Sequence, residues 1–255
     1  MGAHQKLDRA ARRNLSLIWP EIDFPSIKLI LHFEGKNGPD GVKRKSPAQD
    51  EPWHYYDPKS KEDQPLLRLI RDHYQNLVTE LRAKNTERSA FEAAWLAHAL
   101  VDGLTPAHHY PYEEELTKLR GEGLETRDSI KEKLVISGDT KLEALANNWR
   151  MWGAKGLMTT HGLFELGIAM IISPMRLKKT TLPSDEEIAA FLRDGAVATF
   201  EQYAKEIDEL GMYERFYRLG WTKKLTRQVR QDLAPRIVKI VTLSWYAALK
   251  EAERS

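Results

Sequence analysis

Apolar side chains recur at helical spacing along most of the sequence, and this periodicity limits the fold more than any other feature. An amphipathic helix presents an apolar residue every three or four positions, whereas a half-buried strand alternates at every second position. Residues 64–84, QPLLRLIRDHYQNLVTELRAK, carry one such helical stripe, which comprises Leu66, Leu67, Ile70, Tyr74, Leu77 and Leu81. Strand-like alternation is scarce elsewhere. The chain is therefore predicted to be all-α.

Other segments have helical patterns as well. Residues 89–104 are apolar around nearly the whole circumference, which predicts a buried helix, and HQKLDRAARRNLSLI near the N-terminus is also helical in pattern. A further helix is expected from Ser184, which can form a capping box with Glu187, towards Gly211. Another covers roughly residues 223–251, with a bend at Pro235. Because the sequence shows no internal repeat, we expect one multi-helix domain with long loops over residues 1–255.

Two segments depart from this regular pattern. Residues 34–63 are rich in Gly, Pro, Lys and Asp and contain EPWHYYDP near their end. A loop of that length inside a compact domain is usually functional or disordered. Residues 113–148 are highly charged and are predicted to form an excursion with short helices.

The composition is that of an ordinary soluble globular protein, with 42% hydrophobic and 30% charged residues. A net charge of +2 is too mild to indicate binding to nucleic acid or to an acidic membrane. The apolar run at 163–175 is too short to span a membrane and contains Glu165. The first residues, MGAHQKLDRAARR, are charged where a signal peptide would be apolar. We therefore expect either a cytosolic protein, or a secreted or cell-envelope protein whose leader was removed.

Histidine and carboxylate residues form pairs at helical spacing. The stretch HALVDGLTPAHHYPY, residues 98–112, holds three of the chain's eight histidines. His98 and Asp102 share one helix face because they stand four residues apart, and His108 follows a turn marked by Gly103 and Pro106. One interpretation is a buried His–Asp hydrogen bond beside a solvated His108. The other is a metal site.

A second pair favours the metal site. His161 and Glu165 also stand four residues apart in an apolar, helix-like segment, so that the two pairs are expected to face each other around shared cations. His54, with Asp40 fourteen residues before it, and His4 are further candidate ligands. Cysteine is absent, so any metal must be held by imidazole and carboxylate, which suits Zn²⁺ in hydrolytic sites.

These motifs together resemble the zinc-dependent phospholipase C family and its relatives, the zinc-dependent single-strand nucleases. HALVDGLTPAH is similar to the family's HxxxDxxxPxH motif, and HYYDP to the His-aromatic-aromatic-Asp-Pro element of the phospholipase branch. HGLFE matches that branch's HxxxE pair, and Asp40 lies at the matching distance before His54. The resemblance covers ligand elements from residue 4 to residue 165, in the family's order. It implies an all-α fold of the phospholipase C and nuclease type.

The resemblance implies three zinc ions and their ligands. The first would be held by Asp40, His54, His98 and Asp102; the second by His108, His161 and Glu165; and the third by Asp102 as a bridge, His4, and the amino group and carbonyl of the first residue. The chain departs from the family in two ways. It begins Met1-Gly2-Ala3 where the family has a chelating Trp, and its longer gap between His108 and His161 marks residues 113–148 as an insertion or lid. His109 is an alternative to His108, although the spacing from Asp102 favours His108.

The implied reaction is zinc-dependent phosphoester hydrolysis, in which Asp40 also orients or deprotonates the attacking water. The HYYDP and HxxxE details favour a phospholipase C acting on a phospholipid, with transient contact to a membrane surface. Trp53, Tyr55 and Tyr56 are expected to contact a quaternary ammonium headgroup, although they could equally stack on a base or pack beneath the loop. A single-strand nuclease is the alternative. A helical protein with a structural or degenerate zinc site is a further alternative.

Overall fold

In the computed structural model, which describes residues 2–46, 55–62, 64–177 and 181–254, helices are the only regular secondary structure of the described chain. The prediction of an all-α fold is thus confirmed. The elements assemble around one continuous apolar core that draws residues from both ends of the sequence, from Leu7 to Leu249. No helix in the described ranges is both long and apolar enough to cross a membrane.

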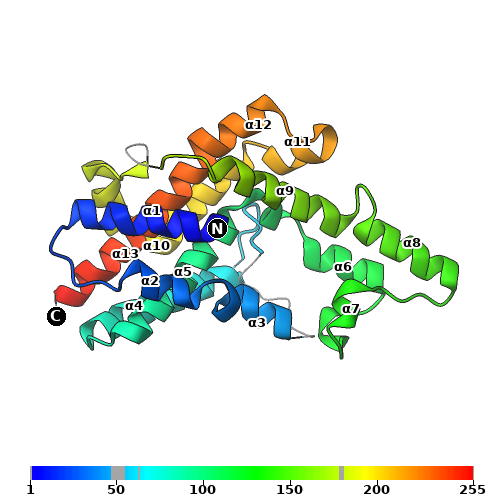
Figure 1. The fold of residues 1–255 in the computed structure, drawn as a ribbon, viewed down its shortest axis with the longest axis horizontal. Coiled ribbons are helices and arrows are strands. Elements are labelled where there is room, and N and C mark those ends of the chain that lie inside the picture. Colours follow the sequence, from blue (N-terminus) through cyan, green and yellow to red (C-terminus); the bar gives the residue numbers. More distant parts are fainter. Residues whose placement is uncertain (1, 47–54, 63, 178–180, 255) are drawn as a thin grey trace.

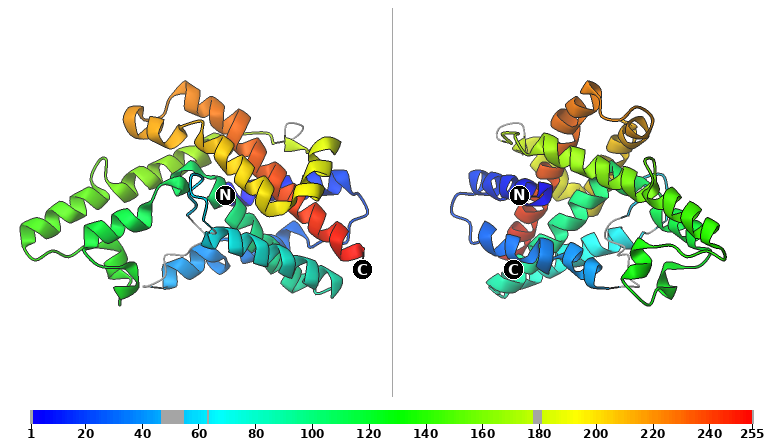
Figure 2. Two further views of the ribbon diagram at one scale, coloured as in Figure 1. Left: turned by 180° about the vertical axis from the view of Figure 1, so that it is seen from behind. Right: turned by 45° about the vertical axis from the view of Figure 1, so that its right-hand side comes forward.

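Helix α5 (Thr86–Leu104) lies at the centre of the molecule, packed against α4 (Pro65–Arg82), α10 (Asp185–Asp208) and α13 (Ala234–Glu253) (Figure 1). Most of its side chains are buried, as its apolar circumference predicts. Helix α1 (Ala3–Ile18) packs on α13 and brings the N-terminus towards the centre of the molecule (Figures 1 and 2). The indole of Trp245 on α13 donates a hydrogen bond to the carbonyl of Ala93 on α5, 3.1 Å away.

Gly103 permits the close packing at the end of α5. A Cβ atom on this residue would lie 2.5 Å from a methyl group of Leu66 and 2.6 Å from the ring of Phe200. Both neighbours are fully buried, so neither side chain has room to move away. Any larger residue would push α4 or α10 away from α5 next to Asp102.

Two predicted helix features are confirmed, one of them in altered form. Ser184 and Glu187 form the expected capping box at the start of α10. The predicted C-terminal helix is present as α12 (Lys223–Gln228), a π-helical segment (Val229–Leu233) and α13, and the irregular turn immediately precedes Pro235. Proline lacks a backbone N–H and its ring clashes with the carbonyl four residues before it, which a wider π turn accommodates.

The polar segment that begins at residue 34 is more ordered than predicted. It contains the 3₁₀ turn η2 (Gly35–Asn37) and the helix α3 (Pro39–Lys45), which starts with Pro39 in the first turn, where a missing N–H costs nothing. The prediction of a continuous loop was therefore wrong over these residues.

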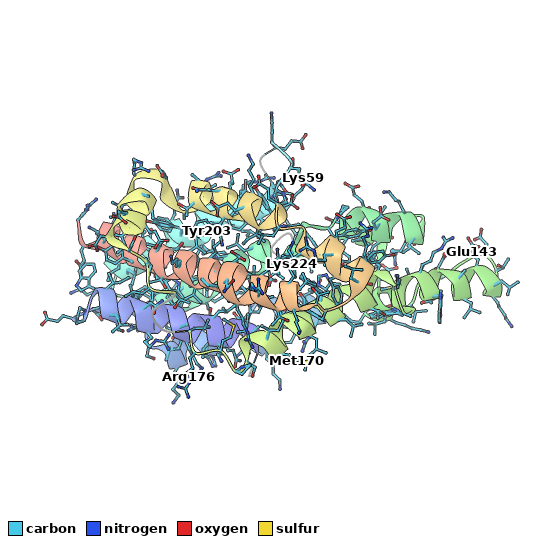
Figure 3. The ribbon with its side chains drawn as sticks, turned by 90° about the horizontal axis from the view of Figure 1, so that it is seen from above. Lys59, Glu143, Met170, Arg176, Tyr203 and Lys224 are labelled. Carbon is cyan, nitrogen blue, oxygen red and sulfur yellow. The ribbon has the colours of Figure 1, made fainter. Side chains whose placement is uncertain are left out.

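Residues 112–152 form an arm that projects from the helical body (Figure 1). The arm comprises α6 (Tyr112–Arg120), η4 (Leu124–Thr126), α7 (Lys131–Leu134) and α8 (Lys141–Trp152), and Glu143 on α8 lies near its outer end (Figure 3). It has its own small apolar core, made of Leu116, Leu124, Ile136 and Met151. Helix α9 (Leu157–Ile172) leads from the arm back to the body. The short helices expected within 113–148 are present.

Candidate metal centre

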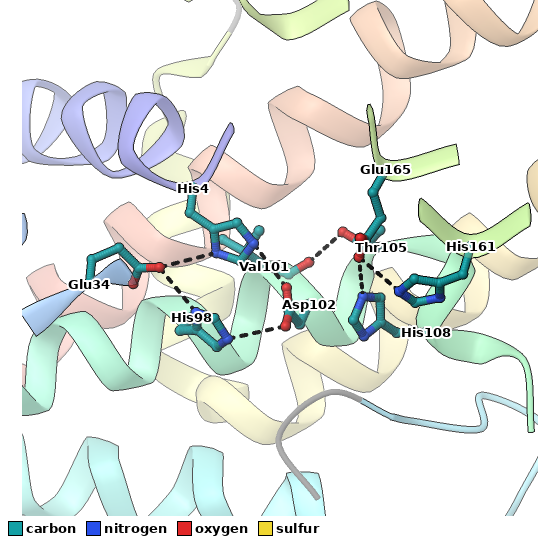
Figure 4. A network of polar contacts seen from close by, with 9 residues as sticks. All are labelled: His4, Glu34, His98, Val101, Asp102, Thr105, His108, His161 and Glu165. Carbon is teal, nitrogen blue, oxygen red and sulfur yellow. Dashed lines mark hydrogen bonds and ion pairs between the residues drawn. The ribbon is translucent and has the colours of Figure 1, made fainter. Parts of the chain in front are cut away.

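The described residues hold two groups of histidine and carboxylate side chains that could bind metal. We define the first cluster as His4, Glu34, His98 and Asp102. Asp102 lies close to both imidazoles, with Oδ1 3.0 Å from His4 Nε2 and Oδ2 3.1 Å from His98 Nε2 (Figure 4). Glu34 Oε1 lies on the other side of the two rings, 3.2 Å from His98 Nδ1 and 3.8 Å from His4 Nδ1.

Three separate elements position the first cluster. His98 and Asp102 project from one face of α5 because they are one turn apart. His4 comes from the first turn of α1. Glu34 follows the short 3₁₀ turn η1 (Leu31–Phe33), and the left-handed Gly35 (φ +67°) then redirects the chain.

Burial and opposite charge compete in the first cluster. Burial lowers the pKa of the His4 imidazole, but the nearby Asp102 carboxylate outweighs it and raises the pKa of His4 to about 9. The pKa of His98 is likewise raised, because Asp102 and Glu34 outweigh the burial of its ring. Glu34 Oε2 is buried and has no hydrogen-bond partner. An unsatisfied buried oxygen beside two imidazoles is the arrangement that a divalent cation would complete, so these residues fit a zinc ion.

The second cluster consists of His108, His161 and Glu165. Glu165 Oε1 lies 2.7 Å from His108 Nε2 and 3.1 Å from His161 Nε2 (Figure 4). His161 and Glu165 are one turn apart on α9, and His108 comes from the 3₁₀ turn η3 (Pro106–His109) that follows α5. The Glu165 side chain is 42% exposed, whereas both imidazoles are largely buried. The cluster is therefore open to solvent at the carboxylate.

The pKa shifts in the second cluster favour a neutral imidazole and a charged carboxylate. Burial works to raise the pKa of Glu165, but hydrogen bonds from His108 and His161 outweigh it and lower that pKa below its usual range. Burial lowers the pKa of His161. Neutral imidazole and ionised carboxylate are the forms that bind a metal ion.

Aromatic side chains surround the second cluster. The Tyr55 ring stacks on His108, with 5.7 Å between ring centroids, and the Tyr112 ring meets His161 edge-on at 4.6 Å. The backbone N–H of Tyr56 donates to the carbonyl of His108, 3.0 Å away, which fixes the chain next to the site. These contacts hold the two imidazoles in place.

A single turn of chain joins the two clusters. Thr105 Oγ1 donates to the carbonyl of Val101, 2.8 Å away (Figure 4). The backbone N–H of His108 donates to the carbonyl of Thr105, also at 2.8 Å. Only five residues separate Asp102 from His108: the last two residues of α5, Thr105 and the first two residues of η3. The two clusters are therefore neighbours, joined by the end of α5 and the 3₁₀ turn η3.

A pocket with a volume of about 610 Å³ lies next to the second cluster, where Thr160 forms part of its wall. Its lining is aromatic and charged, and includes Tyr110, Tyr213, Tyr217, Lys118, Arg150 and Lys155. The arm and α11 (Met212–Leu219) contribute most of these residues.

The structure brings together most of the predicted ligands. His4, His98 and Asp102, which were assigned to a first and a third zinc, meet in one cluster, and His108, His161 and Glu165 meet in the other. His109 is not part of either cluster; its Nε2 instead donates to the carbonyl of Gly103, 2.8 Å away. His54, Trp53 and Met1 lie outside the described residues.

Two predicted roles do not agree with the structure. Asp40 is half-buried at the start of α3 and belongs to neither cluster; the carboxylate beside His98 is that of Glu34. Tyr56 is only 4% exposed, and its ring packs on Phe200, so it is a core residue rather than a substrate contact. Tyr55 is the aromatic residue of this pair that faces the site.

The sequence-based prediction missed two carboxylates. Glu34 has no local pattern that marks it, because its histidine partners are 30 and 64 residues away in the chain. Asp8 is 1% exposed, and burial together with the charge of Glu34 raises its pKa. A signal for Asp8 was present in the sequence, since it stands four residues after His4, as Asp102 and Glu165 stand four residues after their histidines.

Comparison of the chain with protein-family models, with curated proteins and with solved structures found no match.

Proposed function

We propose that the protein is a zinc-dependent phosphoester hydrolase whose fold is related to the phospholipase C and single-strand nuclease families. The observation that carries this proposal is the second cluster, which offers three donors: two largely buried imidazoles and one carboxylate that is 42% exposed. A closed site of four protein ligands is typical of structural zinc, whereas three ligands with an open position are typical of catalytic zinc.

The two clusters would divide the metal ligands between them. His4, Glu34, His98 and Asp102 would hold zinc in the buried cluster, and His108, His161 and Glu165 would hold it in the open one. Zinc in such sites makes hydroxide available near neutral pH and polarises a phosphoryl oxygen.

The chain's own residues would orient and attract the substrate. Asp102 holds His4 and His98 with one carboxylate oxygen each, which fixes both rings. Tyr55 and Tyr112 fix the imidazoles of the open cluster. Lys43 Nζ lies 5.9 Å from the centroid of the Tyr55 ring and so places a positive charge where a phosphate would approach His108.

A phospholipid is the substrate that we favour, because the arm exposes an apolar stripe. Helix α8 turns Leu142, Leu145, Trp149 and Trp152 towards solvent, with exposed fractions from 43% to 79%. Their spacing of three, four and three residues places them on one helix face. Helix α8 contacts α9, which carries His161 and Glu165. An amphipathic helix with tryptophans on its apolar face is suited to a lipid surface, which would bring the headgroup near the open cluster.

A single-strand nuclease is the second candidate, and the pocket next to Thr160 favours it. Tyr110, Tyr213 and Tyr217 are available to stack on a base, and Arg150 and Lys155 to bind a phosphate. The same cations would also serve a lipid phosphate, so the pocket by itself does not exclude the favoured substrate.

Parallel assays distinguish these functions. A short-chain phosphatidylcholine and a single-stranded oligonucleotide are incubated with zinc-loaded protein, with Glu165→Gln as the variant of the open cluster and Glu114→Gln on the surface of the arm as the control. We expect turnover of the lipid, reduced in Glu165→Gln and kept in the control. Faster turnover of the oligonucleotide would identify a nuclease. Zinc binding without turnover of either substrate would leave a structural zinc protein.

A further inference from the structure

Asp8 is a buried carboxylate for which the described protein provides no partner. The residue is 1% exposed, and neither of its oxygens has a hydrogen-bond partner. An ionised carboxylate in this state is costly, since a buried charge must be paired or bound to a metal. Glu92 is a useful contrast, because it is equally buried but lies 2.6 Å from His73 Nδ1 and 2.8 Å from an Arg88 nitrogen.

The Asp8 carboxylate lies within electrostatic range of the first cluster. It interacts electrostatically with Glu34, His4 and His98, and it projects from the same face of α1 as His4, one turn along the helix. The pair on α1 thus repeats the arrangement on α5, where His98 precedes Asp102 by four residues. Each of the two helices thus carries one imidazole and one carboxylate on one face, and Glu34 lies beside both imidazoles.

The charges of the cluster call for cations. Asp8, Glu34 and Asp102 together carry three negative charges when ionised. Two protonated imidazoles, or one divalent cation beside neutral imidazoles, would leave one of these charges unbalanced. Asp8 and Glu34 Oε2 supply the buried oxygens that remain without partners. Hard carboxylate oxygens beside imidazoles suit zinc and similar divalent ions.

We infer that Asp8 is a metal ligand of the first cluster. It acts with His4, Glu34, His98 and Asp102, so that each of α1 and α5 binds the metal through a His-x-x-x-Asp pair. The inference rests on metal binding at the first cluster, as the proposed function does, but on no particular substrate.

The test measures zinc binding directly. Protein stripped with a chelator is titrated with Zn²⁺ by calorimetry, in a His161→Gln/Glu165→Gln background that disables the second cluster. Loss of a partner that only orients a ligand weakens metal binding 10–100-fold, so we expect Asp8→Asn to weaken zinc binding by at least about 100-fold. The melting temperature is measured with and without zinc, and the rise that zinc produces should shrink in Asp8→Asn.

Glu92→Gln is the matched control, because it also removes a buried carboxylate, but one that has cationic partners. It should lower the melting temperature of the metal-free protein and leave the zinc affinity unchanged. Asp8→Leu, which replaces the orphaned carboxylate with an apolar group, provides a second test if Asp8→Asn is unstable. Wild-type zinc affinity in either folded Asp8 variant would overturn the inference while leaving the proposed function intact. If the His161→Gln/Glu165→Gln protein with Asp8 intact does not bind zinc, both the inference and the first metal site of the proposed function are overturned.

Discussion

At the scale of single residues, the position of Asp102 distinguishes it from the other carboxylates of the site. Its two oxygens contact His4 and His98, which come from different helices, whereas one oxygen of Glu165 contacts both of its histidines. Asp102→Asn would remove the charge and replace one of these acceptors with a donor. We expect it to lower kcat/KM by roughly 100-fold or more, and by more than Glu165→Gln does. Steady-state kinetics of both zinc-loaded variants check this order, and equal small losses would contradict it.

His109, the neighbour of a cluster residue, should make the stability of the protein depend on pH. Burial lowers the pKa of His109 to about 4, despite the nearby charges of Asp57 and Asp208. Because the folded pKa lies below the unfolded value of about 6.5, His109 contributes its full stability above pH 6.5 and loses it as the pH falls towards 4. The loss should reach roughly 3 kcal/mol.

Urea unfolding of metal-free protein between pH 7 and pH 4 tests this prediction. The His109→Gln variant keeps a donor for the carbonyl of Gly103 but does not titrate in this range. The difference in unfolding free energy between wild type and variant should therefore shrink as the pH falls. A difference that stays constant with pH would show that His109 does not titrate as described.

At the scale of elements, replacing either of two glycines on the helices of the site with alanine should change the stability of the fold in opposite directions. Gly103→Ala would force a methyl group against Leu66 and Phe200, and we expect it to destabilise the fold by about 1–3 kcal/mol. A Cβ on Gly162 of α9 would meet no atom within 4 Å, so Gly162→Ala should stabilise the fold by about 0.5–1 kcal/mol. Thermal unfolding of the two variants measures both effects. If both substitutions change the stability in the same direction and by a similar amount, the packing around Gly103 does not restrict the size of the side chain there.

The elements were predictable to different degrees because the signals for them differ in range. Helix periodicity and the capping box at Ser184 are local, so α4, α5 and α10 could be located from the sequence. The His-carboxylate pairs were also predictable, since a spacing of four residues on a helix fixes their proximity. Glu34 was not, because only the folding of η1 against α5 brings it to His98. Asp40 was assigned from its distance before His54 in the pattern of the phospholipase C family, and it lies on α3, in neither cluster of the described residues.

At the scale of the whole molecule, the arm should determine where the protein meets its substrate. The stripe of Leu142, Leu145, Trp149 and Trp152 has no cover within the described chain, and burying such side chains against lipid is worth about 1.5–3 kcal/mol for each one fully buried. We expect the double variant Leu145→Gln/Trp149→Gln to weaken binding to phosphatidylcholine vesicles at least about tenfold. Its turnover of a dispersed short-chain lipid should stay close to the wild-type value.

Sedimentation with vesicles, together with the short-chain assay, separates docking from chemistry. Leu17 on α1 is 63% exposed and lies outside the arm, so Leu17→Gln is the control for the loss of an exposed apolar side chain. This control should bind vesicles as the wild type does, because one isolated apolar side chain contributes little to a lipid interface. If the double variant and the control bind vesicles equally well, the stripe serves another partner. In that case the preference for a lipid substrate would lose its support, while the two metal clusters would keep theirs.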